Sequence, residues 1–128
     1  MGKRVLLAED EPNIAVSLQF LLNRAGYEVR ILESGADALR EARAWAPDLM
    51  ILDVMLPEMD GLEVLAKLRA EAPGRPLPVL MLTAKGARET QEAALSAGAD
   101  AFITKPFANS EVLAVVARLA QGAEAAPE

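Results

Sequence analysis

The chain has 128 residues, enough for one domain with a hydrophobic core, and its 52% hydrophobic and 25% charged content is ordinary for a globular protein. It contains no Cys and no His, which excludes disulfides, thiolate metal sites, Ser-His-Asp triads and imidazole bases, so any chemistry rests on carboxylates, Lys, hydroxyls and backbone groups. The net charge of −6, without a run of Lys or Arg, predicts that this domain does not bind nucleic acid by itself.

The first quarter of the chain predicts a strand, a helix and a second strand. Two basic residues and a short apolar run precede the first acids, too little for a signal sequence or a membrane span, so we expect no membrane association and a cytoplasmic location. Arg4–Ala8 predicts a strand. Pro12–Ala25 predicts a helix, because Pro12 suits a first helical turn and Gly26 suits the position after a last one. Tyr27–Leu32 alternates polar and apolar residues, as an edge strand with one wet face would.

The middle of the chain repeats this alternation of strand and helix. Ala36–Trp45 predicts a helix, and the wholly apolar run Leu49–Leu52 predicts a strand that is covered on both faces. Leu62–Glu71 predicts the next helix, with Asp60 as its cap. Val79–Leu82 is a second wholly apolar run and predicts another buried strand.

The last third of the chain predicts two more helices around a final strand. Ala87–Ala97 predicts a helix with little apolar character, Ala101–Thr104 the last strand, and Ser110–Leu119 the last helix. Residues 1–120 would then form the domain, and 121–128, which are small and polar, would be a flexible tail or the start of a linker.

About five strands alternating with about five helices predict a doubly wound α/β fold around a parallel sheet. In such sheets ligands bind beyond the carboxyl ends of the strands, near the point where the strand order reverses. The polar residues at the predicted strand ends are Glu9, Asp10, Asp53, Thr83 and Lys105. We therefore expect three acids, one hydroxyl and one amine to meet at one edge of the sheet.

Each of these residues also has a simpler interpretation when it is taken alone. Glu9 and Asp10 could be solvated acids beside a helix start, and Asp53 could be a turn residue. Thr83 could bond locally at its strand end, and Lys105 could be plain surface charge. Their joint placement at the strand ends is what favours a shared site.

The charges of the predicted site favour a bound cation and an anionic ligand. Three crowded carboxylates would repel one another, so at least one would be protonated unless a cation lay among them. Oxygen ligands without His or Cys favour a hard ion, and few protein ligands with several waters favour Mg²⁺ over Ca²⁺. Mg²⁺ and Lys105 would neutralise the three acids and leave a pocket suited to a phosphoryl dianion. Asp53 is then the predicted nucleophile, and an aspartyl phosphate its product.

Four segments, LLAEDEP, ILDVMLPEMDG, LMLTA and GADAFITKPF, occur in an order that resembles the receiver domains of bacterial response regulators, the CheY-like domains of two-component signal transduction. The resemblance covers the chain from about Arg4 to about Leu119. It implies a flavodoxin-like, doubly wound, five-stranded parallel sheet of order 2-1-3-4-5 with helices on both faces. It also implies a signalling domain that catalyses only its own phosphorylation and slow autodephosphorylation.

The resemblance implies a role for each acid and for two side chains that would tune the site. Asp53 would be the phosphorylated aspartate and a metal ligand. Asp10 would bind Mg²⁺ directly, Glu9 through water, and Met55 through its backbone carbonyl, and Mn²⁺ could take the place of Mg²⁺. In the family, side chains at the positions of Met55 and Lys85 tune the lifetime of the phosphoryl group.

The resemblance also implies how the phosphoryl group would be recognised. Thr83 would hydrogen-bond one phosphoryl oxygen and Lys105 would pair with another. The small Ala84 would leave room for the group to enter. A cis peptide bond is expected before Pro106, because only X–Pro bonds adopt that geometry at low cost.

A conformational switch is the expected consequence of phosphorylation. The phosphoryl group would draw the Thr83 hydroxyl toward it, and Phe102, at the aromatic switch position, would fill the space; ordinary core packing is the alternative role of Phe102. Ala87–Ala97 has Leu95 as its only large apolar side chain, so we expect that helix to shift at low cost. The face of the fourth helix, last strand and last helix would then control an output domain or partner, and could pair two copies as a homodimer.

The phosphoryl donor must be a separate molecule, since the chain has no His: a phosphohistidine on a sensor histidine kinase or phosphotransfer protein, or a small phosphodonor. Three alternatives remain open. A phosphatase of the haloacid dehalogenase kind would have a second acid where this chain has Met55, which cannot transfer a proton. A flavin-binding module would have a phosphate loop rich in Ser, Thr and Gly in place of the acidic AEDEP. A degenerate receiver would act only as a docking surface.

Overall fold

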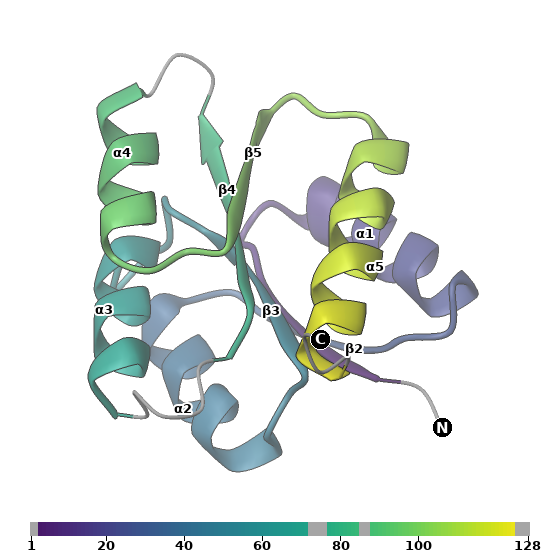
Figure 1. The fold of residues 1–128 in the computed structure, drawn as a ribbon, viewed down its shortest axis with the longest axis horizontal. Helices are drawn as coiled ribbons and strands as arrows, with labels where there is room; N and C mark the ends of the chain where they lie inside the picture. The colour runs from purple at the N-terminus through teal and green to yellow at the C-terminus, as the bar shows by residue number, and fades with distance from the viewer. Residues whose placement is uncertain (1–2, 72–76, 85–87, 125–128) are drawn as a thin grey trace.

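Parallel strands form the centre of the structure, and a helix follows each of them (Figure 1). The computed structural model describes residues 3–71, 77–84 and 88–124. Within these ranges the elements in chain order are β1 (Arg4–Ala8), α1 (Pro12–Arg24), β2 (Glu28–Leu32), α2 (Gly35–Trp45), β3 (Leu49–Asp53), α3 (Gly61–Glu71), β4 (Val79–Ala84), α4 (Arg88–Ser96), β5 (Ala101–Lys105) and α5 (Asn109–Glu124).

The strand order is β2-β1-β3-β4-β5, and all neighbouring pairs are parallel, which confirms the predicted sheet. The reversal of order lies between β1 and β3, where Leu7 is in register with Ile51. On the other side of β3, Asp53 is in register with Leu82 of β4. The carboxyl ends of β1, β3, β4 and β5 therefore lie at one edge of the sheet, the upper edge in Figure 1.

Two apolar cores lie on opposite faces of this sheet. One contains side chains from α2, α3 and α4, such as Trp45, Leu65 and Ala94, and the other contains side chains from α1 and α5, such as Leu18 and Val116. The strands between them are buried throughout β3 and nearly so in β1, as the wholly apolar runs predict. Among the described residues, no helix has the length and apolar character needed to cross a membrane.

Side chains or proline at the first turns fix where the helices begin. The Ser34 hydroxyl accepts a hydrogen bond from the backbone N–H of Asp37 at the start of α2, at 3.1 Å. Asp60 accepts one from the N–H of Glu63 at 2.9 Å, which confirms its predicted capping role for α3. Pro12 begins α1, and the N-cap residue before it, Glu11, makes no side-chain hydrogen bond to the helix.

The structure differs from the sequence prediction mainly at element ends. β3 and β5 each extend one residue further than predicted, so that Asp53 and Lys105 are the last residues of strands rather than the first residues of loops. The backbone continues to pair there because the N–H of Val54 still donates to the carbonyl of Leu82, at 3.0 Å.

The last helix is also longer than the predicted Ser110–Leu119, since α5 runs from Asn109 to Glu124. The predicted tail therefore begins inside this helix, and its last four residues lie outside the described residues. The start of the helix predicted from Ala87, the role of Lys85 and the side chain of Ala84 also lie outside them.

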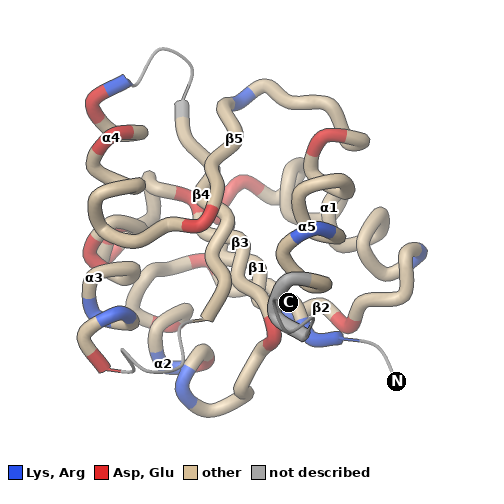
Figure 2. Tube along the Cα trace, viewed as in Figure 1, with Lys and Arg blue, Asp and Glu red and all other residues tan. Residues whose placement is uncertain are grey.

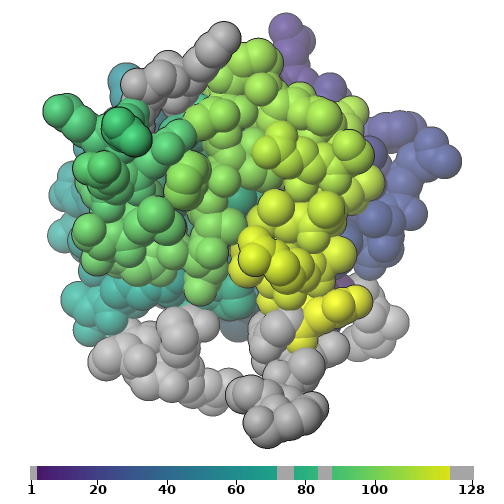
Figure 3. Space-filling view, turned by 45° about the horizontal axis from the view of Figure 1, so that its top comes forward, coloured from purple at the N-terminus to yellow at the C-terminus, as the bar shows by residue number. Residues whose placement is uncertain are grey.

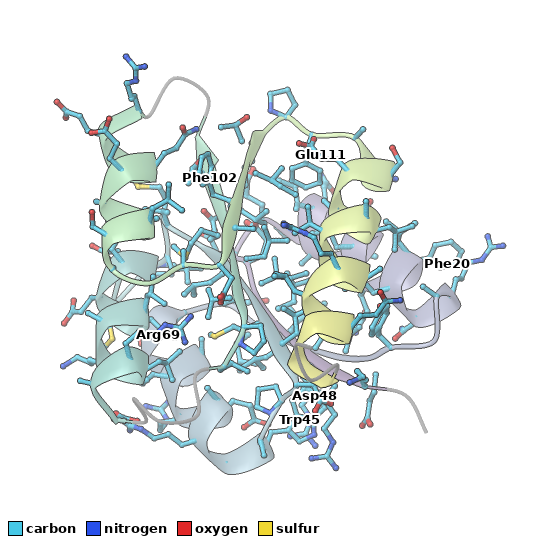
Figure 4. The ribbon with its side chains drawn as sticks, viewed as in Figure 1. Phe20, Trp45, Asp48, Arg69, Phe102 and Glu111 are labelled. Atoms are coloured by element: carbon cyan, nitrogen blue, oxygen red, sulfur yellow. The ribbon has the colours of Figure 1, made fainter. Side chains whose placement is uncertain are left out.

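Arg69, near the end of α3, forms hydrogen bonds that link α3 to two other segments of the chain (Figure 4). Its guanidinium donates to the Leu77 carbonyl at 2.7 Å, to the Gly98 carbonyl at 2.7 and 3.1 Å, and to the Asp100 carboxylate at 3.1 Å. The same Asp100 oxygen accepts the N–H of Val79 at 2.8 Å. One side chain thus joins α3 to the start of β4 and to the turn between α4 and β5.

Replacing Arg69 by Lys is expected to lower the free energy of unfolding by about 1–3 kcal/mol, because a single ammonium cannot reproduce the planar set of donors. The measurement is urea unfolding followed by circular dichroism. Arg118→Lys is the matched control, since Arg118 is exposed on α5, and should change stability little. Equal effects of the two substitutions would contradict the role assigned to Arg69.

Candidate functional site

The predicted acids meet where β1 and β3 end. Carboxylate oxygens of Glu9, Asp10 and Asp53 all lie within 4.8 Å of one another. Figure 2 shows red, acidic segments of the chain gathered around the upper ends of the central strands. Asp10 is exposed, whereas Glu9 and Asp53 are buried. The structure thus brings together the acids that the sequence places at two different strand ends.

Glu9 is the most deeply enclosed member of this group, with no exposed side-chain surface. Its Oε2 accepts the backbone N–H of Glu11 at 3.0 Å, and its Oε1 forms an ion pair with the Lys105 ammonium at 3.0 Å. Burial raises the pKa of Glu9 to about 7; the N–H of Glu11 and the Lys105 ammonium counter this in part, while Asp53 adds to it. Glu9 is therefore not the solvated loop acid that the sequence left open.

Asp53 ends β3 and is held on both carboxylate oxygens. Oδ1 accepts the backbone N–H of Met55 at 3.1 Å, which is a turn-type bond, and Oδ2 accepts from the Lys105 ammonium at 2.8 Å. Gly61 packs against the same strand end, since a Cβ there would lie 2.3 Å from the Asp53 carbonyl oxygen. Only glycine allows α3 to start so close to the backbone of Asp53.

Lys105 ends β5 and reaches across β4 to the acids. Its Nζ lies 2.8 Å from Asp53 Oδ2, 2.9 Å from Glu11 Oε1 and 3.0 Å from Glu9 Oε1, and only 19% of its side chain is exposed. Burial lowers the pKa of Lys105, but the bonds to Asp53, Glu11 and Glu9 outweigh that effect and raise the pKa above its usual value. The amine is therefore a fixed positive charge. The peptide bond between Lys105 and Pro106 is cis, as predicted.

A cavity of about 300 Å³ opens at this edge of the sheet. Its lining consists of Asp10, Glu11, Asp53, Met55 and Lys105. Met55 lies on its rim with 71% of its surface exposed. This position, which holds a second acid in phosphatases of the haloacid dehalogenase kind, is thus occupied by a side chain that cannot transfer a proton. The cavity offers charged oxygens at its base, one ammonium and free access from outside.

Thr83 and Phe102 lie beside this cavity rather than in it. Thr83 follows Leu82, the register partner of Asp53, and its Oγ1 is completely buried with no hydrogen-bond partner among the residues that the structure describes. It does not bond locally, as the simpler interpretation would have it. Phe102 is half-buried and packs against the core that contains Ala94 of α4 (Figure 4). This placement fits both the switch role and the core-packing role.

Glu11 is a member of the site that sequence reasoning missed. It lines the cavity and hydrogen-bonds Lys105 at 2.9 Å. The signal in the sequence was the third acid of Glu9-Asp10-Glu11, directly before the helix-starting Pro12. A residue directly before a helix ordinarily bonds to that helix, whereas the partner of Glu11 lies 94 residues away.

The chain is similar to known proteins. Residues 5–117 match the family described as the response regulator receiver domain. TcrX of Mycobacterium tuberculosis, a probable transcriptional regulatory protein, is 48% identical over 109 residues, which cover 85% of this chain and 46% of that protein. PhoP of Bacillus subtilis, the alkaline phosphatase synthesis transcriptional regulatory protein, is 42% identical over 126 residues, 98% of this chain and 52% of that protein. The chain thus spans about half the length of these relatives.

Solved structures share the fold over nearly the whole chain. A CheY-like response regulator receiver domain protein from Methanospirillum hungatei has a TM-score of 0.89 and 31% identity, and covers 97% of this chain and 98% of its own. The receiver domain of a sensor histidine kinase from Pseudomonas aeruginosa has a TM-score of 0.85 and 30% identity over 94% of this chain and 99% of its own. That structure has a magnesium ion coordinated in its active-site cleft. From its sequence, its sheet order and the acids at its strand ends, the chain belongs to the response regulator receiver family, the phospho-acceptor signalling domains of two-component systems.

Proposed function

We propose that this domain receives a phosphoryl group on Asp53. The observation that supports this most directly is the position of its carboxylate, which faces an open cavity while an ammonium 2.8 Å away holds one of its oxygens. Lys105 fixes the position of the Asp53 carboxylate and can neutralise charge on an arriving phosphoryl group. Met55, which replaces the acid–base residue of a phosphatase, favours a held phosphoryl group over turnover.

The acids fit a magnesium ion. Three carboxylate oxygens lie within 4.8 Å of one another, and the single positive charge of Lys105 cannot balance three negative charges, so a divalent cation among them would relieve their repulsion. We assign Glu9, Asp10, Asp53 and the backbone carbonyl of Met55 as the residues that would hold the ion, with Mn²⁺ as a substitute. The Pseudomonas receiver domain, which has magnesium in its cleft, supports this assignment. The ion would supply charge compensation for the phosphoryl oxygens.

The transfer itself needs positioning more than acid–base catalysis. A carboxylate oxygen of Asp53 attacks phosphorus, and the bond to the donor breaks in line with the attack: a P–N bond of phosphohistidine or a P–O bond of a small acyl phosphate. Lys105 and the hydroxyl of Thr83 would bind two oxygens of the transferred group. The family implies a cognate histidine kinase as the donor, and we propose a cytoplasmic location for the exchange.

Movements of the Thr83 and Phe102 side chains would change the protein surface when Asp53 is phosphorylated. Thr83 Oγ1 has no partner in the structure, so a phosphoryl oxygen would give this hydroxyl its first hydrogen bond. Its movement toward that oxygen would free space beside Phe102, which packs against the α4 side of the sheet. In Figure 3 α4, β5 and α5 form one continuous face, and we propose that this face binds an output domain or pairs two copies of the domain.

Incubation with acetyl phosphate and Mg²⁺ is expected to add a single phosphoryl group, measured by intact-protein mass spectrometry. Asp53→Asn should give no adduct, because an amide is not a nucleophile for this reaction, and a chelator should suppress the adduct in the wild type. Asp48→Asn is the matched control, since Asp48 lies at the opposite end of β3. An unmodified wild type, or an adduct that persists in Asp53→Asn, would contradict the proposal.

Magnesium should raise the melting temperature more at about pH 8 than at about pH 5.5, because the Glu9 carboxyl with a pKa of about 7 must lose its proton to bind the ion.

Without metal, the raised pKa of Glu9 means that the folded state binds more protons than the unfolded state. Stability should therefore fall by roughly 1–3 kcal/mol as pH rises from 4.5 through about 7. Glu9→Gln should remove this fall. Differential scanning calorimetry with and without Mg²⁺ tests both effects, and a pH-independent shift would disprove them.

Thr83→Val should raise the free energy of unfolding by about 1 kcal/mol, since it removes a buried hydroxyl without a partner. The same substitution should abolish the response of the Phe102 ring resonances to beryllofluoride, a stand-in for the phosphoryl group, and any shift toward a dimer in size exclusion. Thr104→Val, one strand away in register, is the control and should keep the response. A Thr83→Val protein that responds like the wild type would rule out the switch.

A further inference from the structure

Glu11 occupies a helix N-cap position but directs its side chain elsewhere. Residues at this position ordinarily bond back to the first turn of their helix. Glu11 makes no such bond; its Oε1 accepts a hydrogen bond from Lys105 at 2.9 Å, and it lines the same cavity as Asp53. The side chain is thus held by the site and not by the helix that it precedes.

The three carboxylates around Lys105 differ in how easily each could be displaced. An ammonium has three protons, and Nζ has three carboxylate neighbours, at 2.8, 2.9 and 3.0 Å. The side chains of Glu9 and Asp53 are 0% and 4% exposed, so neither can exchange Lys105 for water. The side chain of Glu11 is 60% exposed, and it can turn into solvent at the small cost of an exposed ion pair.

Glu11 also changes the charge of the site. Mg²⁺ and Lys105 together would balance Glu9, Asp10 and Asp53, and Glu11 adds one further negative charge at the cavity lining. An incoming phosphoryl donor is itself an anion. The carboxylate of Glu11 therefore repels the donor. In addition, Lys105 has no free proton to donate to it, because all three are directed at carboxylates.

We propose that Glu11 is a positioning residue that occupies, on Lys105, the place that a phosphoryl oxygen takes after transfer, and that it thereby restrains phosphorylation by anionic donors. This inference rests on the proposed function of Asp53. Before transfer, Glu11 accepts the third hydrogen bond that the Lys105 ammonium can donate. After transfer, a phosphoryl oxygen accepts that hydrogen bond instead, and the Glu11 side chain turns into solvent. Glu11 therefore affects the formation of the aspartyl phosphate more than its loss.

The test compares rate constants of phosphorylation by acetyl phosphate with Mg²⁺ for the wild type, Glu11→Ala, Glu11→Gln and Glu28→Ala. Glu28 is the matched control because its side chain is 59% exposed, it pairs with an Arg, and it lies at the far end of β2. Glu11→Ala is expected to be phosphorylated about two- to fivefold faster than the wild type, the range that an exposed ion pair accounts for. Glu11→Gln should also be faster, and Glu28→Ala should match the wild type.

Two further readouts separate a positioning role from a general structural one. The advantage of Glu11→Ala should shrink as salt screens the repulsion, and the rate of phosphoryl loss should stay unchanged. An unchanged or slower Glu11→Ala, a salt-independent gain, or equal effects on formation and loss would overturn the inference. A wild type that takes no phosphoryl group would instead overturn the proposed function. Glu11→Ala removes no capping bond, so its melting temperature should stay close to that of the wild type.

Discussion

The ammonium group of Lys105 counters the repulsion among the acids at the functional edge of the sheet. Two of its carboxylate neighbours, Glu9 and Asp53, are buried, and charges in such positions are stable only when they are paired. Lys105 belongs to β5, two strands from Asp53, so it reaches the acid only when β4 is in place between them. The strand order therefore determines the chemistry of the site, because the pairing of β5 with β4 also brings the Lys105 ammonium to Asp53.

The sequence predicted the fold closely because its elements are marked by local signals. The apolar runs of β3 and β4 are too short for buried helices and bounded by polar or Pro residues, and α1 starts at Pro12. The acids of the site were predictable for a related reason, since strands that end at one edge of a parallel sheet must place their next side chains near one another. The family resemblance added the strand order and the cis bond before Pro106, both of which the structure has.

The features that the sequence did not predict depend on contacts between distant residues. Nothing near Glu9 shows that its side chain is fully enclosed, and enclosure is what raises its pKa. Glu11 meets its partner 94 residues away. The missing partner of Thr83 Oγ1 is equally invisible in a strand-end Thr, because most such hydroxyls bond to nearby backbone. The ends of β3 and β5 were predicted one residue short, and the end of β4 two residues short, for a similar reason. Asp53, Thr83 and Lys105 are polar, and only the neighbouring strands show that their backbones stay in the ladder.

The bonds of Arg69 have a mechanical consequence for α4. They hold Gly98, two residues after that helix, and Leu77, before β4, to the end of α3, so the C-terminal end of α4 is anchored to the body of the domain. The other end, at Arg88, lies toward the edge of the sheet at which the strands have their carboxyl ends (Figure 1). A helix that is fixed at one end acts as a lever. If the proposed phosphorylation displaces the Arg88 end, α4 would rotate about Gly98, by an amount that grows with distance from the Arg69 guanidinium.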